Sequence, residues 1–168
     1  MKRIFFICLM VLLTSPYFTY TSNADELKIV PPDTMIVIVR TPCFGFCPFY
    51  KLTIHGDGKI EFIGKGDVDG TGLHVKTISP EKVILILKEL DRINFNDLDN
   101  ISFADLNTPP LTHNSSIILS LTQKNKQEGF YHILGSDSKK DKMVVTLVDT
   151  IVDLAEIIDW VHSSSKGI

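Results

Sequence analysis

Two cysteines separated by three residues constrain this chain more than any other feature, and they lie in the segment Thr41–Tyr50, TPCFGFCPFY. Four Cα steps from Cys43 to Cys47 would span about 13 Å in an extended chain, whereas a disulfide requires Cα atoms about 4.4 to 6.8 Å apart. Gly45 at the centre can adopt the positive φ of a tight turn. We therefore predict a local disulfide in a turn that joins two strands.

A hairpin follows the cysteines, and its register can be worked out from its side chains. A two-residue turn at Asp57-Gly58 would set Ile54 opposite Glu61, whereas a three-residue loop that includes Gly56 pairs Ile54 with Ile60. The second register places only apolar side chains on one face, so we predict it. These side chains are Tyr50, Leu52, Ile54, Ile60 and Phe62.

The run TPCFGFCPFYKLTIHGDG resembles the signature of an uncharacterised bacterial domain family, which reads approximately T-P-C-F-G-x-C-P-x-Y-x-x-x-I-x-G-D-G. The similarity extends over about residues 34–162. Two departures are that Asn107 stands where many members have proline, and that a second cysteine pair of some members is absent. Because the family has no established activity, the resemblance implies a fold and no mechanism. The matching residues are Thr41, Pro42, Cys43, Phe44, Gly45, Cys47, Pro48, Tyr50, Ile54, Gly56, Asp57 and Gly58.

The N-terminus has the three parts of a secretory signal peptide. Lys2 and Arg3 precede the apolar run Ile4–Leu13, and Ser22-Asn23-Ala24 supplies the small residues of a cleavage site. The apolar run is too short to anchor a chain across a bilayer, so we expect cleavage after Ala24 and export to the periplasm or the extracellular space. An uncleaved membrane tether is the alternative. Oxidising compartments favour disulfides, in agreement with the predicted cysteine pair.

The rest of the chain is predicted to form one domain, because 44% hydrophobic and 22% charged residues in a chain of 168 are typical of a single globular core. We place a signal peptide at residues 1–24, a linker at 25–33, the domain at 34–162 and a C-terminal tail at 163–168. The formal net charge of −3 comes from interspersed charges, which excludes the basic surface of a typical nucleic-acid-binding protein. No stable membrane span is expected after signal cleavage.

Apolar periodicity predicts the element order ββββαββα. The expected class is a two-layer α+β domain, in which an antiparallel sheet of about six strands carries two helices on one face. A polar turn is expected at Lys124–Gln127. Besides the two strands of the hairpin, strands are predicted at Met35–Val39, Leu73–Ile78, Ser115–Thr122 and Gly129–Leu134.

Both helices are predicted from apolar side chains at helical spacing. The first begins after Ser79 as N-cap, with Pro80 at its first position, and ends near Asn94. The second begins with Asp141 as its cap, and one continuous apolar stripe runs through it over Val144–Val161. The stripes of both helices are expected to pack on the sheet.

The sequence selects no catalytic residue, and it contains no phosphate-binding, dinucleotide or nucleophile-elbow motif. Its five histidines lack the spacing of a zinc site. Cys43 and Cys47 raise one alternative, a thiol redox or copper-handling site with His55 as a candidate further ligand. Against this alternative, a strand begins directly after Pro48, whereas redox cysteines typically lie at helix N-termini, where the dipole lowers the thiol pKa.

The long connection from about Asp99 to His113 has no periodicity and contains Pro109-Pro110. It is either a functional loop or a disordered excursion. We predict an exported, non-enzymatic binding or accessory domain without a cofactor, whose partner is a protein or a small-molecule ligand. The candidate binding residues lie in the cysteine segment and in this connection: Phe44, Phe46, Tyr50, Asp105, Thr108 and His113.

Overall fold

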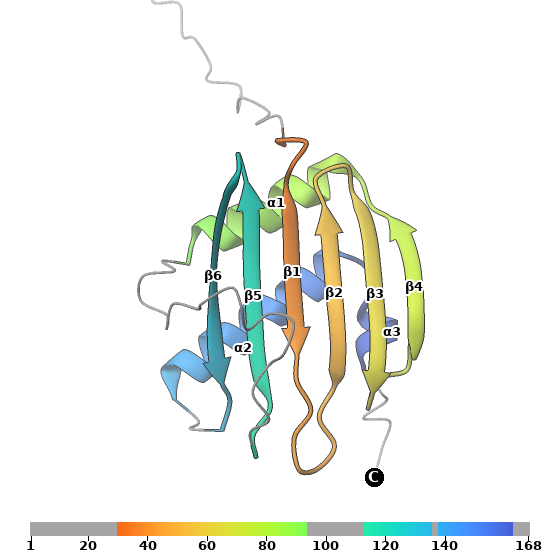
Figure 1. The fold of residues 1–168 in the computed structure, drawn as a ribbon, viewed down its shortest axis with the longest axis vertical. Helices are drawn as coiled ribbons and strands as arrows, with labels where there is room; N and C mark the ends of the chain where they lie inside the picture. Colours follow the sequence, from red (N-terminus) through yellow and green to blue (C-terminus); the bar gives the residue numbers. More distant parts are fainter. Residues whose placement is uncertain (1–29, 94–112, 136–137, 163–168) are drawn as a thin grey trace, which may run out of the picture.

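The computed structural model describes residues 30–93, 113–135 and 138–162 (Figure 1). The predicted signal peptide and C-terminal tail lie outside these residues. The described elements follow the predicted order ββββαββα, extended by a short third helix. The strands are β1 (Met35–Arg40), β2 (Phe49–His55), β3 (Lys59–Gly66), β4 (Gly72–Thr77), β5 (Ser116–Gln123) and β6 (Lys126–Ile133). The helices are α1 (Pro80–Asp91), α2 (Lys139–Leu154) and α3 (Ile158–Val161).

The six strands form one sheet in the order β4-β3-β2-β1-β5-β6, and every neighbouring pair is antiparallel. Figure 1 shows α1, α2 and α3 behind the sheet, all on one face. The predicted two-layer α+β architecture is therefore confirmed. No helix in the described part of the chain is long and apolar enough to cross a membrane.

The hairpin of β2 and β3 has the predicted three-residue register, since Ile54 pairs with Ile60 and Leu52 pairs with Phe62. The turn closes on itself, because the Gly58 amide donates to the His55 carbonyl at 2.9 Å. The sequence alternation that predicted this register places one apolar face of both strands toward the helices.

The core lies between the sheet and the helices. Full burial of one large apolar side chain contributes about 1.5–3 kcal/mol before the loss of conformational entropy is subtracted, so this layer is the main source of stability. The helices contribute Val83, Ile86 and Leu90 from α1 and Val144, Val148 and Ile151 from α2. The five predicted inward side chains of the hairpin are completely buried: Tyr50, Leu52, Ile54, Ile60 and Phe62.

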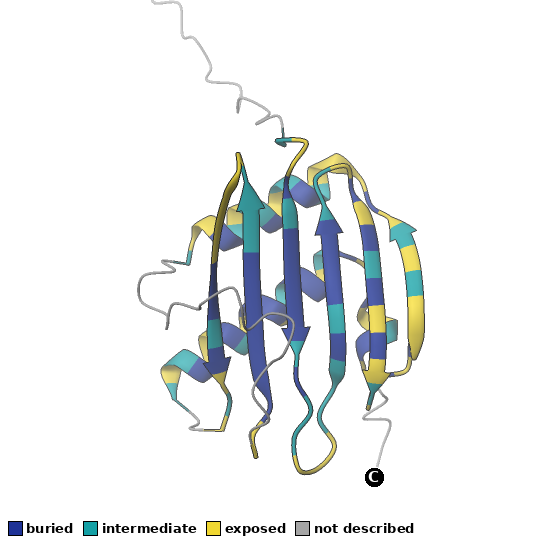
Figure 2. Ribbon diagram, in the orientation of Figure 1, coloured by how far each residue is buried: buried dark blue, intermediate teal, exposed yellow. Residues whose placement is uncertain are grey.

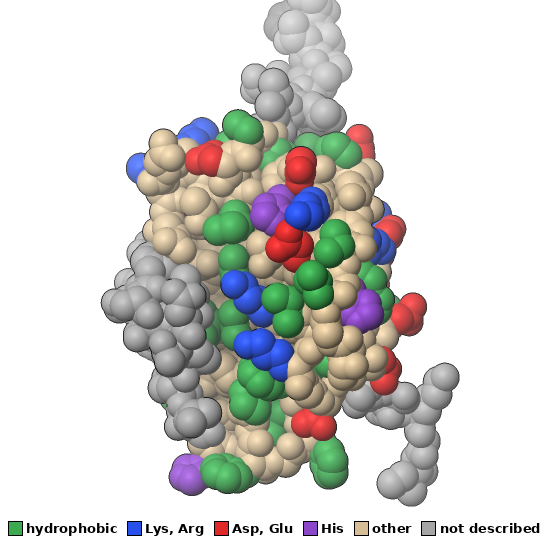
Figure 3. All heavy atoms as spheres, turned by 45° about the vertical axis from the view of Figure 1, so that its right-hand side comes forward, with side chains coloured by type: hydrophobic (Ala, Val, Ile, Leu, Met, Phe, Trp, Pro, Cys, Tyr) green, Lys and Arg blue, Asp and Glu red, His purple; other side chains and the backbone are tan. Residues whose placement is uncertain are grey.

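The other face of the sheet is mixed in character. Its centre holds a small buried cluster made by Val37, Val39 and Ile118. Toward β4 the residues become exposed, as the yellow segments of Figure 2 show. Figure 3 shows apolar side chains with charged ones beside them in this part of the surface. The exposed apolar residues there are Ile63, Leu73 and Val75.

The predicted start of the C-terminal helix is wrong. Helix α2 begins after Ser138, whose hydroxyl accepts a hydrogen bond from the Asp141 amide at 3.1 Å. Ser138 is therefore the N-cap, and Asp141 lies in the first turn. Both residue types favour caps, and the serine three residues earlier satisfies the free amide of Asp141.

The single apolar stripe over Val144–Val161 is also wrong, because it belongs to two helices. Helix α2 ends at Leu154, and Glu156 adopts a positive φ of 55°, which is incompatible with a continuing right-handed helix. The Glu156 carboxylate forms ion pairs with Lys76 of β4 and Lys82 of α1. These two contacts hold the break between α2 and α3 against the rest of the fold.

Two further details, at the β5–β6 turn and at the start of α1, differ from the predictions. The β5–β6 turn consists of Lys124 and Asn125 alone, with φ values of 50° and 59°, so β6 begins earlier than predicted, at Lys126. Two successive residues with positive φ are typical of a tight hairpin turn. Ser79 stands at the N-cap of α1 as predicted, but its side chain makes no capping hydrogen bond.

Candidate functional site at the cysteine loop

The cysteine loop, Cys43–Cys47, connects β1 to β2 at one end of the sheet (Figure 1). A disulfide joins its two cysteines, with the Cα atoms 5.7 Å apart, so the predicted bridge is confirmed. Gly45 has a φ of +148°, which side chains rarely allow. Because the ring is short, with a sequence separation of 4, its entropic contribution to stability is about 2 kcal/mol.

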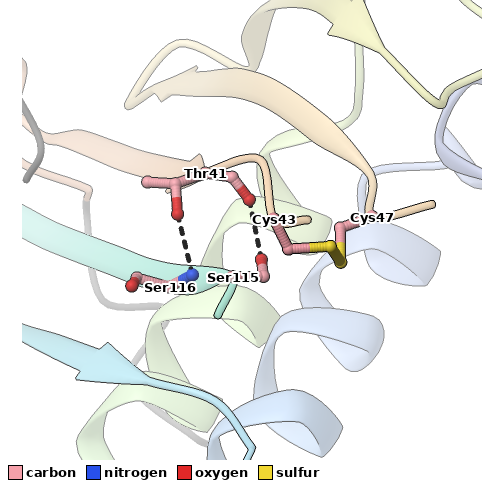
Figure 4. Close-up of a disulfide and its surroundings, with 5 residues drawn as sticks. All are labelled: Thr41, Cys43, Cys47, Ser115 and Ser116. Carbon is pink, nitrogen blue, oxygen red and sulfur yellow. Dashed lines mark hydrogen bonds between the residues drawn. A yellow bond between two sulfur atoms is a disulfide. The ribbon is translucent and has the colours of Figure 1, made fainter. Parts of the chain in front are cut away.

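Three hydrogen bonds fasten the first stem of the loop to the start of β5, two of which are drawn in Figure 4. The Ser115 hydroxyl donates to the Thr41 carbonyl at 2.7 Å. The Ser116 amide donates to the Thr41 hydroxyl at 2.8 Å, and the Thr41 amide donates to the Ser116 carbonyl at 2.9 Å. All three residues are buried. Since such bonds contribute about 1 kcal/mol each, the loop has a fixed base.

Two aromatic side chains project from this fixed loop. Phe44 is 83% exposed and Phe46 is 96% exposed. The ring of Phe44 lies 5.0 Å from the ring of His113, and the Phe44 amide donates to the His113 carbonyl at 3.3 Å. Large apolar side chains that remain in water on a constrained loop are typical of recognition surfaces.

The structure brings two of the six predicted binding residues, Phe44 and His113, into contact, and a third, Phe46, lies exposed in the same loop. Tyr50 follows the loop in the chain but is completely buried under the helices, so it does not form part of the loop surface. The remaining two, Asp105 and Thr108, lie outside the described residues.

The alternative ligand set of Cys43, Cys47 and His55 is not brought together. The cysteines precede β2 and His55 ends it, so a full strand separates them, which corresponds to more than about 17 Å. Among residues 30–93, 113–135 and 138–162, no three His, Cys, Asp or Glu side chains are grouped to hold a metal ion. The cysteines connect two strands and do not begin a helix, so they lack the helix N-terminus at which redox cysteines typically lie.

Two polar side chains lie at the base of the cysteine loop, on the helix-covered face. Arg40 and Tyr50 are directly opposite each other in β1 and β2 and form the last pair before the loop. The Tyr50 hydroxyl and the Arg40 Nε atom are buried, and neither makes a hydrogen bond of normal geometry with a described residue. Burial raises the pKa of Tyr50 to about 12; the Arg40 side chain opposes this rise through its charge and its closeness to the hydroxyl, and the charge of Asp149 adds to it.

Sequence analysis missed Arg40, because it ended the first strand at Val39. The signal was nevertheless present in the alternation of the strand. Ile36, Ile38 and Arg40 are two residues apart, so they point to the same face. An arginine that continues an apolar, helix-facing row is a departure from the pattern and marks a buried polar position.

A second polar cluster joins β6 to α2. Asp141 lies between His132 and Ser138: its Oδ1 atom is 2.6 Å from His132 Nε2 and accepts a hydrogen bond from the Ser138 hydroxyl at 3.0 Å. Its Oδ2 atom accepts a hydrogen bond from the Gly135 amide at 3.0 Å. In a nucleophilic triad the serine would bond to the imidazole, whereas here both groups bond to the carboxylate. The arrangement fixes the start of α2.

Comparison with known proteins gives one positive result. The sequence profile of a domain family described as a domain of unknown function, DUF6438, matches residues 34–154. No curated protein matches the chain. The matched range contains the cysteine loop, the hairpin, the whole sheet and helices α1 and α2. The chain therefore belongs to the family DUF6438, a domain of unknown function.

Proposed function

We propose that this chain is an exported, non-enzymatic binding domain whose recognition element is the cysteine loop. The observation that carries the proposal is the pair of exposed side chains of Phe44 and Phe46 on a loop closed by a disulfide. Immobilising a flexible loop on binding costs conformational entropy, and a loop that is already constrained avoids most of this cost. The disulfide and the seam between Thr41 and β5 provide this constraint.

The shape of the site favours a protein partner. Small-molecule sites are concave and enclose most of the ligand. Phe44 and Phe46 instead project from the tip of a loop, so they fit an apolar depression on another protein. Aromatic side chains that fill such depressions dominate the binding energy of many interfaces.

Two features support export. The N-terminal segment has the charged, apolar and small-residue parts of a signal peptide, and a disulfide persists in an oxidising compartment. We expect the exported protein to begin at Asp25. Intact-mass measurement of protein recovered from the exporting compartment tests this. A species that retains residues 1–24 would show that the apolar run is a membrane tether.

The binding role can be tested by photo-crosslinking inside the producing cell. A photoreactive phenylalanine analogue at position 46 is expected to form one discrete adduct with a single protein, and the same analogue at position 44 should capture the same protein. The matched control is position 85, because Leu85 is also exposed and apolar but lies on α1, away from the loop. Equal capture at positions 46 and 85 would contradict the proposal.

Affinity for the captured protein gives the quantitative test. Phe44→Ala and Phe46→Ala are each expected to weaken binding about 30-fold, since a central aromatic anchor contributes about 2 kcal/mol. Leu85→Ala should leave the affinity unchanged. Calorimetric titration of the purified pair measures all three. An unchanged affinity in both phenylalanine variants would remove the loop as the recognition element.

A further inference from the structure

Arg40 carries a positive charge that is not paired within the described part of the chain, where no carboxylate forms an ion pair with it. Asp149 of α2 acts on the Tyr50 hydroxyl only through its charge. A buried guanidinium nitrogen without a partner is costly, because the group has left water and received no hydrogen bond in return. The position therefore favours an incoming acceptor.

Tyr50 adds a second donor beside it. Residues directly opposite each other in antiparallel strands have Cβ atoms about 4.5–5.5 Å apart, and Arg40 and Tyr50 are such a pair on the same face. The Tyr50 pKa of about 12 keeps the phenol protonated at neutral pH, so its hydroxyl is able to donate. Two strands thus direct unpaired donors to one small region beneath the cysteine loop.

The chemistry of these donors specifies the class of ligand. A guanidinium group is a planar fork of N–H donors that matches two oxygens of a carboxylate or phosphate, and a phenol hydroxyl can donate to a third acceptor site. Arg40 as a residue is only half-buried although its Nε atom is buried, so its side chain extends from the core toward solvent.

We propose that Arg40 and Tyr50 form a binding site for a small oxyanion, a carboxylate or a phosphate, at the base of the cysteine loop. This site is separate from the surface made by Phe44 and Phe46, which point away from the core into solvent. It does not rest on the proposed protein-binding role. A water molecule that bridges the two donors is the competing occupant, and it predicts no dependence on the type of anion.

The direct test follows the Nε–H signal of Arg40 by nuclear magnetic resonance. The chain has only three arginines, so this signal is readily assigned. Sodium phosphate and sodium acetate are titrated separately against sodium chloride at constant ionic strength. We expect a saturable shift of the Arg40 signal with phosphate or acetate. Arg92 is the internal control, because its guanidinium lies 2.9 Å from the Glu89 carboxylate on the surface and should show no saturation.

Variants sharpen the assignment. Tyr50→Phe removes one charge-assisted hydrogen bond and is expected to weaken binding about tenfold, while Arg40→Met should abolish it and Arg92→Met should have no effect. Should Arg40→Met fail to fold, the wild-type titration and Tyr50→Phe still decide the question. The salt that saturates the Arg40 signal at the lower concentration identifies the ligand as a carboxylate or a phosphate.

Three results would overturn the oxyanion site. The first is a shift of Arg40 that does not saturate and equals the shift of Arg92. The second is an unchanged affinity in Tyr50→Phe. The third is an equal response to phosphate, acetate and chloride, which would assign the two donors to a bridging water.

Discussion

The two connections at the ends of β2 are built in opposite ways. In the Gly56–Gly58 turn, which leads to β3, a Cβ atom at Gly58 would lie 2.3 Å from the Ile78 carbonyl oxygen. In the cysteine loop, at the other end of the strand, a Cβ atom at Gly45 would meet its nearest atom, Cys43 Sγ, at 3.8 Å. One connection is enclosed by backbone, and the other extends into open space.

The forces that hold the two connections differ in the same way. The turn is joined to its surroundings by backbone hydrogen bonds, since the Ile78 amide donates to the Gly58 carbonyl at 3.0 Å. This contact ties the turn to the end of β4 and the start of α1. The cysteine loop is closed by its own disulfide, and its hydrogen bonds to other described segments run through Thr41 at its base and from the Phe44 amide to the His113 carbonyl. The turn therefore maintains the fold, whereas side chains of the loop can be substituted without disturbing the sheet.

Gly58→Ala is expected to have the largest effect on stability. The added Cβ atom would overlap the Ile78 carbonyl, and the φ of +88° disfavours any side chain. We expect the free energy of unfolding to fall by more than about 3 kcal/mol. Urea unfolding followed by circular dichroism measures the change.

Gly66 provides the matched control within the same hairpin. A Cβ atom there would meet nothing within 4 Å, so Gly66→Ala should change the free energy of unfolding by no more than about 0.5 kcal/mol. Equal effects of the two substitutions would mean that the turn is not enclosed, and the contrast between the two ends of β2 would fail.

Replacing both Cys43 and Cys47 by serine is expected to have the next largest effect. Opening a ring of this size should lower the free energy of unfolding by about 2 kcal/mol, and the fold should be retained because the core and the sheet do not contain the bridge. Circular dichroism and urea unfolding of oxidised wild type and double variant test this. Loss of cooperative unfolding would place the loop among the elements that maintain the fold.

The redox alternative makes a different prediction for the same cysteines. A structural bridge typically has a reduction potential below about −300 mV, whereas exchange catalysts lie near −120 to about −230 mV. A glutathione redox titration of the wild-type chain is expected to give a value in the lower range. A potential above about −230 mV would make the loop a reactive site and favour thiol chemistry over display of the phenylalanines.

Ser115→Ala tests the seam between the loop and β5. The substitution removes the hydrogen bond from the Ser115 hydroxyl to the Thr41 carbonyl, which is buried from water. We expect a loss of about 1 kcal/mol in the free energy of unfolding. Amide hydrogen exchange should become faster at Phe44, whose amide bonds to the neighbouring His113 carbonyl. Unchanged exchange would show that the disulfide alone orders the loop.

The register of the hairpin was predictable from the sequence because it depends on residues that are close together in the chain. Alternating side chains report which face of a strand is buried, and only one turn length gives Ile54 and Ile60 the same face. The start of α2 was harder to predict, since Ser138 and Asp141 both suit a cap and only the folded geometry shows which one bonds. The helix break at Glu156 depends on Lys76 and Lys82, which come from distant elements.

The candidate site was only partly predictable, because its contacts are long-range. Thr41 is separated from Ser115 and Ser116 by 74 and 75 residues, and no local pattern indicates that β5 lies beside β1. Phe44 and Phe46 were predicted as binding residues, but the sequence did not show how far each side chain is exposed, since apolar residues beside cysteines are equally consistent with burial in a core.

Phe46→Ala is expected to have the smallest effect on stability. It therefore distinguishes most clearly between a role of this side chain in the fold and a role in binding. The side chain is 96% exposed, so its removal takes almost no apolar surface from the folded state, and the free energy of unfolding should change by less than about 0.5 kcal/mol. Phe44→Ala should cost slightly more, because the ring contact with His113 is lost. Urea unfolding of both variants and of Gly58→Ala compares the change in the free energy of unfolding at the two ends of β2. A large loss of stability in Phe46→Ala would mean that the aromatic tip supports the fold. A neutral result would leave binding as the physical reason for keeping this ring in water.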